Sequence, residues 1–306
     1  MIRMAALVMA EMLAFVPASW AQLPAASDEP ITPISPAKPV DARRVLLGAD
    51  LFNDSRLSGD AKRSCASCHD LRSNGATALR HDLAPDGQPI ALNTNTVFNA
   101  ALSFRLNWSG SARTLEDQAA MALLRSDFMA ITRQQAVDRL QQDPAMVERF
   151  RVVYGHVPDW NSLLDAIATF ERTLVTPGSR FDLWLSGDHT ALTSEELTGY
   201  ALFKSIGCVS CHQGSNVGGN LFERRGAVDP TGVSSHDVFR VPSLRNVATT
   251  PPYFHDGSAA TLDIAVREMA SAQLGRGLDV TEVTSITAFL RTLTGRYDGH
   301  AVTAAR

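Results

Sequence analysis

The chain has 306 residues, of which 45% are hydrophobic and 20% are charged, so it is long enough for two folded domains. Its formal net charge of −4 and its pI near 6.1 exclude the basic surface by which proteins bind nucleic acid. No apolar run after the N-terminus reaches the length of a membrane-spanning helix, so we expect no membrane span in the mature protein.

The N-terminal residues have the pattern of a secretory signal peptide. A positively charged start is followed by an apolar centre at residues 5–16 and by small residues up to position 21. Glu11 interrupts the apolar centre, and an amphipathic helix is the alternative. We expect residues 1–21 to be removed on export to the periplasm. Residues 22–40 contain five prolines and no apolar periodicity, which predicts an extended linker.

Helix signals dominate from residue 41 onwards, and strand signals are few. The segment 160–174 carries apolar residues at spacings of three and four, as an amphipathic helix does. Four positions combine an N-cap residue with a side chain three residues later that can reach back: Thr114 with Asp117, Thr132 with Gln135, Thr193 with Glu196, and Asp279 with Glu282. These patterns predict an all-α fold. The turn at 186–188 predicts two domains, at residues 41–187 and 188–306.

The motif Cys-x-x-Cys-His occurs twice, at residues 65–69 and 208–212, and uses every cysteine of the chain. The thiols are Cys65, Cys68, Cys208 and Cys211, and the histidines are His69 and His212. Two thiols at this spacing can bond the two vinyl groups of one porphyrin while the adjacent imidazole ligates its iron. Paired Cys-x-x-Cys motifs also hold zinc, which is the alternative. The trailing histidines favour two cytochrome c-like domains, each with one covalent c-type haem.

Several longer motifs resemble the bacterial dihaem cytochrome c peroxidases. The sequence LFNDSRLSGD at 51–60 precedes the first haem motif, and VPSLRN at 241–246 and PYFHDG at 252–257 follow the second. Further matches lie at 96–102, 115–118 and 170–174, in the order of that family. The resemblance covers most of residues 42–295. Enzymes of the MauG type, which oxidise residues of a partner protein, belong to the same superfamily.

The resemblance implies a division of labour between the haems. The N-terminal haem, ligated by His69, would react with peroxide, and the C-terminal haem would receive electrons. His212 and Met269 would ligate the second iron, and a thioether raises the potential of a haem. Met269 also shares a helical face with Leu262 and Val266, so core packing is the alternative. MauG has a tyrosine in this role, and the methionine therefore favours the peroxidase arrangement.

The resemblance assigns three further roles. Trp108 lies where the family places an indole between the haems, although a single tryptophan is more often a core residue. Asn93, Thr250 and Pro252 fall at the calcium-binding positions, and the alternative is a turn cap and a stiffened loop. Arg245 matches a position beside the second haem and would pair with a propionate, with a surface ion pair as the alternative.

The chain departs from the family in two places. Phe128 stands ten residues after Gln118, where the peroxidases have a glutamate that moves protons, and a phenyl ring cannot do this. The adjacent Asp127 would point about 100° away if the segment were helical. The family's distal histidine position falls near Pro85. His81 is then a displaced distal ligand, a proton carrier, or a surface-loop histidine beside Asp82.

These observations predict an enzyme that reduces hydrogen peroxide to water with electrons from a c-type cytochrome or cupredoxin. One alternative is a MauG-like enzyme that uses peroxide to oxidise side chains of a partner protein. The other is a dihaem electron carrier without catalysis, which Phe128 keeps open. No residue pattern indicates an oligomeric interface.

Overall fold

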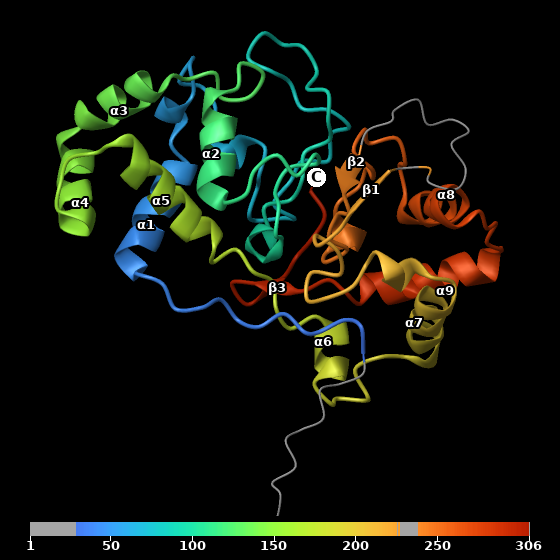
Figure 1. The fold of residues 1–306 in the computed structure, drawn as a ribbon. Coiled ribbons are helices and arrows are strands. Elements are labelled where there is room, and N and C mark those ends of the chain that lie inside the picture. The colour runs from blue at the N-terminus through green and yellow to red at the C-terminus, as the bar shows by residue number, and fades with distance from the viewer. Residues whose placement is uncertain (1–28, 225, 227–237, 306) are drawn as a thin grey trace, which may run out of the picture.

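The computed structural model describes residues 29–224, 226 and 238–305, so the predicted signal at 1–21 lies outside the described residues. Two helical halves lie side by side (Figure 1). The first half contains α1 (Ala42–Phe52), α2 (Leu115–Leu124), α3 (Arg133–Gln141), α4 (Pro144–Tyr154) and α5 (Trp160–Glu171). The short helix α6 (Arg180–Leu185) precedes α7 (Ser194–Ser205), α8 (Leu262–Leu274) and α9 (Val280–Arg291). The prediction of a predominantly helical protein is confirmed.

Strands are short and lie outside the helical cores. β1 (Phe222–Arg224) pairs antiparallel with β2 (Val238–Arg240), and β3 (Arg296–Tyr297) pairs antiparallel with β4 (His300–Ala301). None of the helices in the described part of the chain is both long and apolar enough to cross a membrane.

The predicted helix starts are confirmed. Thr114, Thr132, Thr193 and Asp279 each accept a hydrogen bond from the backbone amide three residues later. The helix predicted at 160–174 ends earlier, at Glu171, because the amides of Thr173 and Leu174 bond three residues back and tighten the last turn.

The two halves repeat one arrangement. In each half a first helix crosses a last helix, α1 over α5 and α7 over α9, with a glycine at the crossing. A Cβ atom on Gly48 would lie 2.0 Å from the Ala166 carbonyl oxygen, and one on Gly199 would lie 1.8 Å from that of Ser285. Only glycine allows backbones to approach so closely. The motif Phe-x-Arg-Thr-Leu ends both last helices, at 170–174 and 289–293.

Helix α6 packs with the second half, although the predicted boundary placed it in the first. The ring centroid of Phe181 lies 4.7 Å from that of Tyr200 and 5.1 Å from that of Phe289. Phe181 is fully buried in the core of the second half. The structure therefore changes from one packing unit to the other before residue 180, near Pro177 and Gly178.

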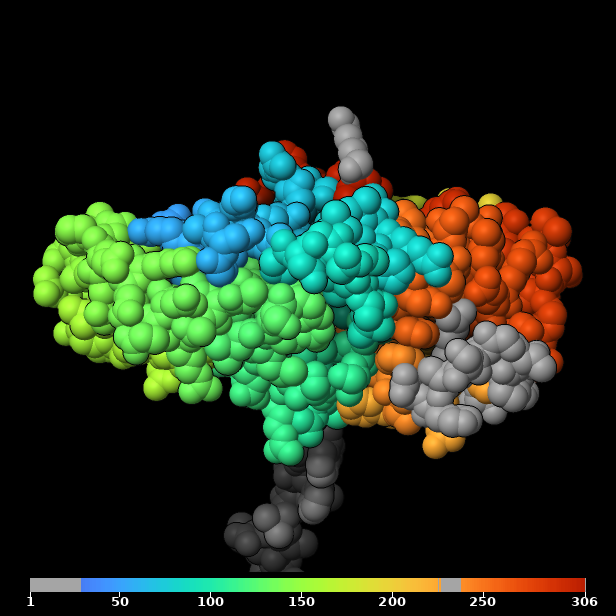
Figure 2. Space-filling view, turned by 90° about the horizontal axis from the view of Figure 1, so that it is seen from above, coloured from blue at the N-terminus to red at the C-terminus, as the bar shows by residue number. Residues whose placement is uncertain are grey.

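The two ends of the chain cross over to opposite halves. Residues 29–40 are extended, as predicted, but they pack against the second half, where Ile31 is fully buried and Glu29 accepts hydrogen bonds from Tyr200 and Lys204. The β3–β4 hairpin packs instead on the first half, where the Tyr297 ring lies 4.9 Å from that of Phe98. Figure 2 shows the resulting elongated body, with the first half blue to green and the second half orange to red.

Candidate functional site

The first Cys-x-x-Cys-His segment forms a short turn that fixes the histidine ring. Cys65–Ser67 is a 3-10 turn, and the amide of His69 donates to the Cys65 carbonyl at 3.0 Å. The Nδ1 atom of His69 lies 3.0 Å from the Gly75 carbonyl oxygen. Burial lowers the pKa of His69, so the imidazole is neutral. A neutral ring that donates from Nδ1 presents Nε2 to a metal.

The second segment repeats this geometry. Cys208–Ser210 is a 3-10 turn, and the amide of His212 donates to the Cys208 carbonyl at 3.0 Å. The Nδ1 atom of His212 lies 3.3 Å from the Val217 carbonyl oxygen, and burial lowers the pKa of His212 to about 4. Each histidine ring also has a phenylalanine of the half's first helix at 6.4 Å, Phe52 for His69 and Phe203 for His212.

The four thiols fit thioether bonds to a porphyrin better than a zinc site. All four are free, and burial raises the pKa of Cys65 to about 12 and those of Cys68 and Cys208 to about 11. A structural zinc site would need four such ligands together in one place. Within residues 29–224, 226 and 238–305, no group of three or more His, Cys, Asp or Glu side chains is arranged to hold a metal ion. The two motifs instead lie in separate halves, each with one oriented histidine.

Trp108 is held between the halves. Its Nε1 atom donates to the Asn93 carbonyl oxygen at 2.8 Å, and its own carbonyl accepts from the Arg240 amide at 2.8 Å. The indole lies edge-on to the His255 ring, with centroids 6.3 Å apart. A cavity of about 470 Å³ between the halves is lined by Ala91, Leu92, Ser109, Val238, Phe239, His255 and Asp256. The indole is thus fixed by contacts to both halves beside a cavity.

Asparagines lock the two haem-motif loops across the same seam. Asn74, five residues after His69, donates to the Thr249 carbonyl oxygen at 2.5 Å. Asn216, four residues after His212, donates to the Ser103 hydroxyl at 3.0 Å. Each loop is therefore tied to the opposite half, and the spacing of the two motifs is fixed by buried hydrogen bonds.

Phe128 lies in a turn at residues 126–129. The expectation that Asp127 points about 100° away from Phe128 assumed a helix, and therefore does not apply. The Arg125 guanidinium carbon lies 4.1 Å from the centroid of the Phe128 ring. Arg125 also donates to Asp127 from Nε at 2.9 Å, and these hydrogen bonds lower the pKa of Asp127. Asp127 is therefore an ion-paired carboxylate and not a substitute for the missing proton-transfer group.

His81 is half-buried rather than a plain surface residue. Its Nδ1 atom is buried and has no hydrogen-bond partner in the described part of the chain. Asp82 is buried too, but it accepts hydrogen bonds from the hydroxyls of Thr77 and Thr94. The negative charge of Asp82 acts on both Cys68 and His69, so this loop borders the first attachment site.

Met269 stands apart from its helical neighbours. It is half-buried on α8, and Leu262 and Val266 pack into the hydrophobic core of the second half while Met269 is not among the described members of that core.

The three predicted calcium positions lie on neighbouring segments. The amide of Asn93 donates to the His255 carbonyl at 2.8 Å, which brings Asn93 to the loop that follows Thr250 and Pro252. The Nδ2 atom of Asn93 donates to the carbonyl of Leu79 at 3.1 Å. These residues offer the oxygen atoms that calcium prefers.

Arg245 is neither at the surface nor free. It is 2% exposed, and its guanidinium donates to Asp182 at 2.7 Å and to the carbonyls of Ser215 and Thr32.

Arg240, which the sequence analysis missed, is also buried but donates only to backbone carbonyls, those of Asn107 and Val241. No carboxylate in the described chain pairs with Arg240, and burial lowers its pKa. A buried guanidinium next to Trp108 thus has no anionic partner among the residues that the structure describes.

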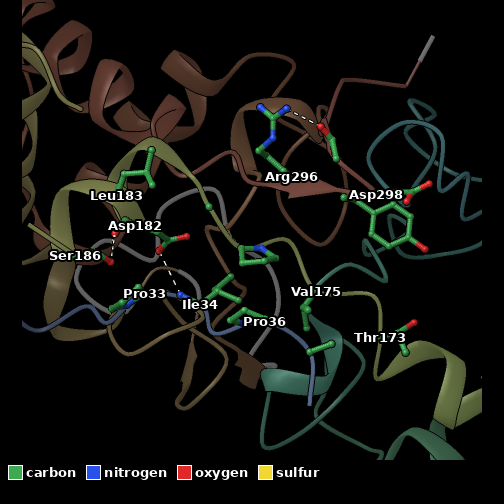
Figure 3. A pocket seen from close by; sticks show the side chains of 15 residues that line it. Pro33, Ile34, Pro36, Thr173, Val175, Asp182, Leu183, Ser186, Arg296 and Asp298 are labelled. Carbon is green, nitrogen blue, oxygen red and sulfur yellow. Dashed lines mark hydrogen bonds between the residues drawn. The ribbon is translucent and has the colours of Figure 1, made fainter. Parts of the chain in front are cut away.

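The larger cavity, of about 870 Å³, opens beside α6 (Figure 3). Pro33 and Ile34 of the N-terminal segment line it together with Asp182 of α6 and with Arg296 and Asp298 of the C-terminal hairpin. None of the cysteines or histidines lines this cavity. It is therefore not part of the candidate site.

Comparisons with known proteins match this arrangement. The di-haem cytochrome c peroxidase family matches residues 42–190. The chain is 42% identical to the cytochrome c551 peroxidase of Nitrosomonas europaea over 88% of this chain and 85% of that protein. It is 32% identical to the methylamine utilization protein MauG of Methylorubrum extorquens over 74% of this chain and 68% of that protein. A solved MauG-like protein associated with microbial copper homeostasis superposes with a TM-score of 0.75 at 25% identity, covering 86% of this chain and 93% of that one.

Proposed function

Because the chain belongs to the di-haem cytochrome c peroxidase and MauG family, we propose that it reduces hydrogen peroxide to water with electrons from a small redox protein. The net reaction joins one peroxide, two electrons and two protons into two waters. The observation that carries this proposal is the pair of buried Cys-x-x-Cys-His turns, each with its histidine Nδ1 held by a carbonyl.

Covalent c-type haems would supply the iron at which peroxide is bound and the two electrons that break its O–O bond. Cys65 and Cys68 would hold the first haem and Cys208 and Cys211 the second. His69 and His212 would ligate the two irons through Nε2. The Gly75 and Val217 carbonyls fix the orientation of these rings. By accepting from Nδ1, they also make Nε2 a more basic ligand for iron.

The second haem would receive the electrons. Met269 is its proposed second ligand, and its exclusion from the neighbouring core supports this role. The buried Arg240 suits a haem propionate better than Arg245 does, because Arg245 already has Asp182 as its anion. Trp108 would relay charge between the haems, since hydrogen bonds hold it against both halves.

The distal side of the first haem is the part of the site that departs from the family. Phe128 cannot transfer a proton, and Asp127 is paired with Arg125. The unpartnered Nδ1 of His81 supports a role for this histidine as a distal ligand or proton carrier. Asn93, Thr250 and Pro252 would bind a calcium ion at the seam.

We expect the protein to be exported to the periplasm through residues 1–21 and to fold as two haem domains, with α6 packed in the second one. A c-type cytochrome or cupredoxin would dock near the second haem. A MauG-like oxidation of a partner protein is the second candidate. Phe128 in the glutamate position favours this second activity, whereas Met269 in place of a tyrosine does not.

The test is electron paramagnetic resonance of the ferric protein before and after one equivalent of peroxide, together with steady-state oxidation of a reduced donor cytochrome. We expect one low-spin haem, assigned by its loss in the Met269→Ala variant, and a second haem that responds to peroxide. A donor oxidation rate no higher than that of free haem would overturn the peroxidase proposal. An oxygen added to a candidate partner only in the presence of peroxide and this protein would support the second candidate.

A further inference from the structure

The end of helix α5 places a buried carboxyl beside the first haem motif. Glu171 is 6% exposed, and its Oε2 atom is buried without a hydrogen-bond partner among the described residues. Burial raises the pKa of the Cys65 thiol most and the negative charge of Glu171 raises it further, so the carboxyl lies close to the point where the porphyrin would be attached. A buried carboxyl without a partner costs stability, and such groups are retained where they act.

The second half of the chain shows what this position holds when no carboxyl is needed. Phe170-Glu-Arg-Thr-Leu174 and Phe289-Leu-Arg-Thr-Leu293 end the two equivalent helices. The hydroxyls of Thr173 and Thr292 donate to the carbonyls of Phe170 and Phe289 at 2.7 and 2.6 Å. The Phe170 ring lies 5.4 Å from the ring of Phe52, and the Phe289 ring lies 5.1 Å from that of Phe203.

These matching contacts make Leu290 the counterpart of Glu171. Leu290 is 3% exposed and belongs to the hydrophobic core against which Cys208 packs. The fold therefore accepts a leucine at this place, and packing does not require a carboxyl. The carboxyl is present only in the half whose haem would react with peroxide.

The surroundings of Glu171 hold few charges that could neutralise it. Glu116 on α2 and Arg172, the C-cap residue of α5, form an ion pair with each other, and Cys65 would be a thioether in the mature protein. Around the adjacent Phe170, α1 contributes Gly48 and Phe52, and Tyr297 of the C-terminal hairpin belongs to the same apolar cluster. Burial raises the pKa of Glu171 to about 8, and the charge of Glu116 adds to this, while Arg172 opposes it.

We propose that Glu171 is the proton-exchanging group of the first haem pocket, which takes up a proton from solvent when an electron enters that haem. This inference rests on the proposed function. One electron and one proton enter together, so the net charge of the pocket does not change. When the electron passes on to peroxide, the proton is released toward one of the two waters that are formed. Glu171 thereby supplies in this chain a proton that Phe128 cannot.

The experiment is a spectroelectrochemical titration of both haems between pH 6 and pH 10 in the holoprotein. We compare the wild type with Glu171→Gln and with a control, Glu195→Gln, which removes an exposed carboxyl in the first turn of α7. In the wild type and the control, the potential of the first haem should be flat below about pH 8, where Glu171 is protonated in both oxidation states, and should fall with rising pH at one proton per electron above it. In E171Q this dependence should disappear, and the potential should stay at the wild-type low-pH value.

A second variant, Glu171→Leu, copies the second half and separates function from folding. We expect E171L to melt no lower than the wild type but to lose at least tenfold in the rate of its reaction with peroxide. A first-haem potential that is independent of pH in the wild type, or an unchanged slope in E171Q, would overturn the inference while leaving the peroxidase function intact. Absence of bound haem would instead overturn the proposed function itself.

Discussion

The two glycine helix crossings lead to a quantitative prediction about stability. In Gly199→Ala the new Cβ atom would lie 1.8 Å from the Ser285 carbonyl oxygen and 3.0 Å from the Cβ of Phe289. Ordinary contacts begin at 3.4 Å, so α7 and α9 would have to separate by about 1.6 Å. Phe289 is fully buried beneath this crossing, and the separation would loosen its contact with Phe203.

Overpacking of a well-packed core costs about 1–3 kcal/mol, and a backbone contact that cannot rotate away belongs at the upper end. We therefore expect G199A to lose about 3 kcal/mol, which corresponds to a fall in Tm of roughly 6–12 °C for a protein of this size. Gly48→Ala, with its contact of 2.0 Å to Ala166, should lose a similar amount.

The assay is thermal unfolding of the holoprotein followed by circular dichroism, with Gly277→Ala as the matched control. A Cβ atom on Gly277 meets nothing within 4 Å, and its backbone does not require glycine. The control should unfold within 1–2 °C of the wild type, because such surface changes are worth about 0.5 kcal/mol or less. A Tm of G199A equal to that of G277A would refute the role assigned to this crossing.

Four further predictions concern single positions. Phe128→Glu should raise the peroxidase rate constant in stopped-flow assays by about tenfold to a hundredfold, below the full range for general acid–base catalysis because Arg125 would hold the new carboxylate ionised. Met269→Ala should convert the second haem to a high-spin signal in electron paramagnetic resonance and lower its potential; an unchanged signal would exclude ligation. Asn246→Ala should lose about 2–4 kcal/mol in urea unfolding, because it removes two buried hydrogen bonds, to Thr176 and Gly295; a loss below 1 kcal/mol would contradict this. Glu171→Gln should become more stable than the wild type as the pH rises from 5 to 9, since the raised pKa makes the folded wild type lose stability from about pH 4.5 to pH 8; parallel stability curves would show that the carboxyl is not protonated in the folded protein.

Local patterns in the sequence predicted local structure well. Thr114 and Thr193 start their helices as expected, because a cap depends on residues only three positions apart. The Cys-x-x-Cys-His segments likewise form their turns from neighbouring residues, so the attachment residues could be named without a structure.

Contacts between distant segments could not be predicted in this way. The partner of Arg245 is Asp182, and the neighbour of Glu171 is Cys65, more than sixty and one hundred positions away. A charged residue in an apolar helix pattern gives no sign of whether solvent or another segment covers it. The proposed roles of Arg240 and Glu171 therefore became visible only through burial and the absence of a partner.

The crossed chain ends have a consequence for how the enzyme comes into being. Residues 29–40 are synthesised before the rest of the described chain, yet the surface that buries Ile31 belongs to segments between Phe181 and Leu293. Val302, close to the other terminus, completes the apolar cluster around Phe52 in the first half. The core of the first half therefore cannot be completed before Val302 has been synthesised. Once both ends have docked, each half holds a segment from the opposite end of the described chain, so a separation of the two halves would have to break one of these contacts.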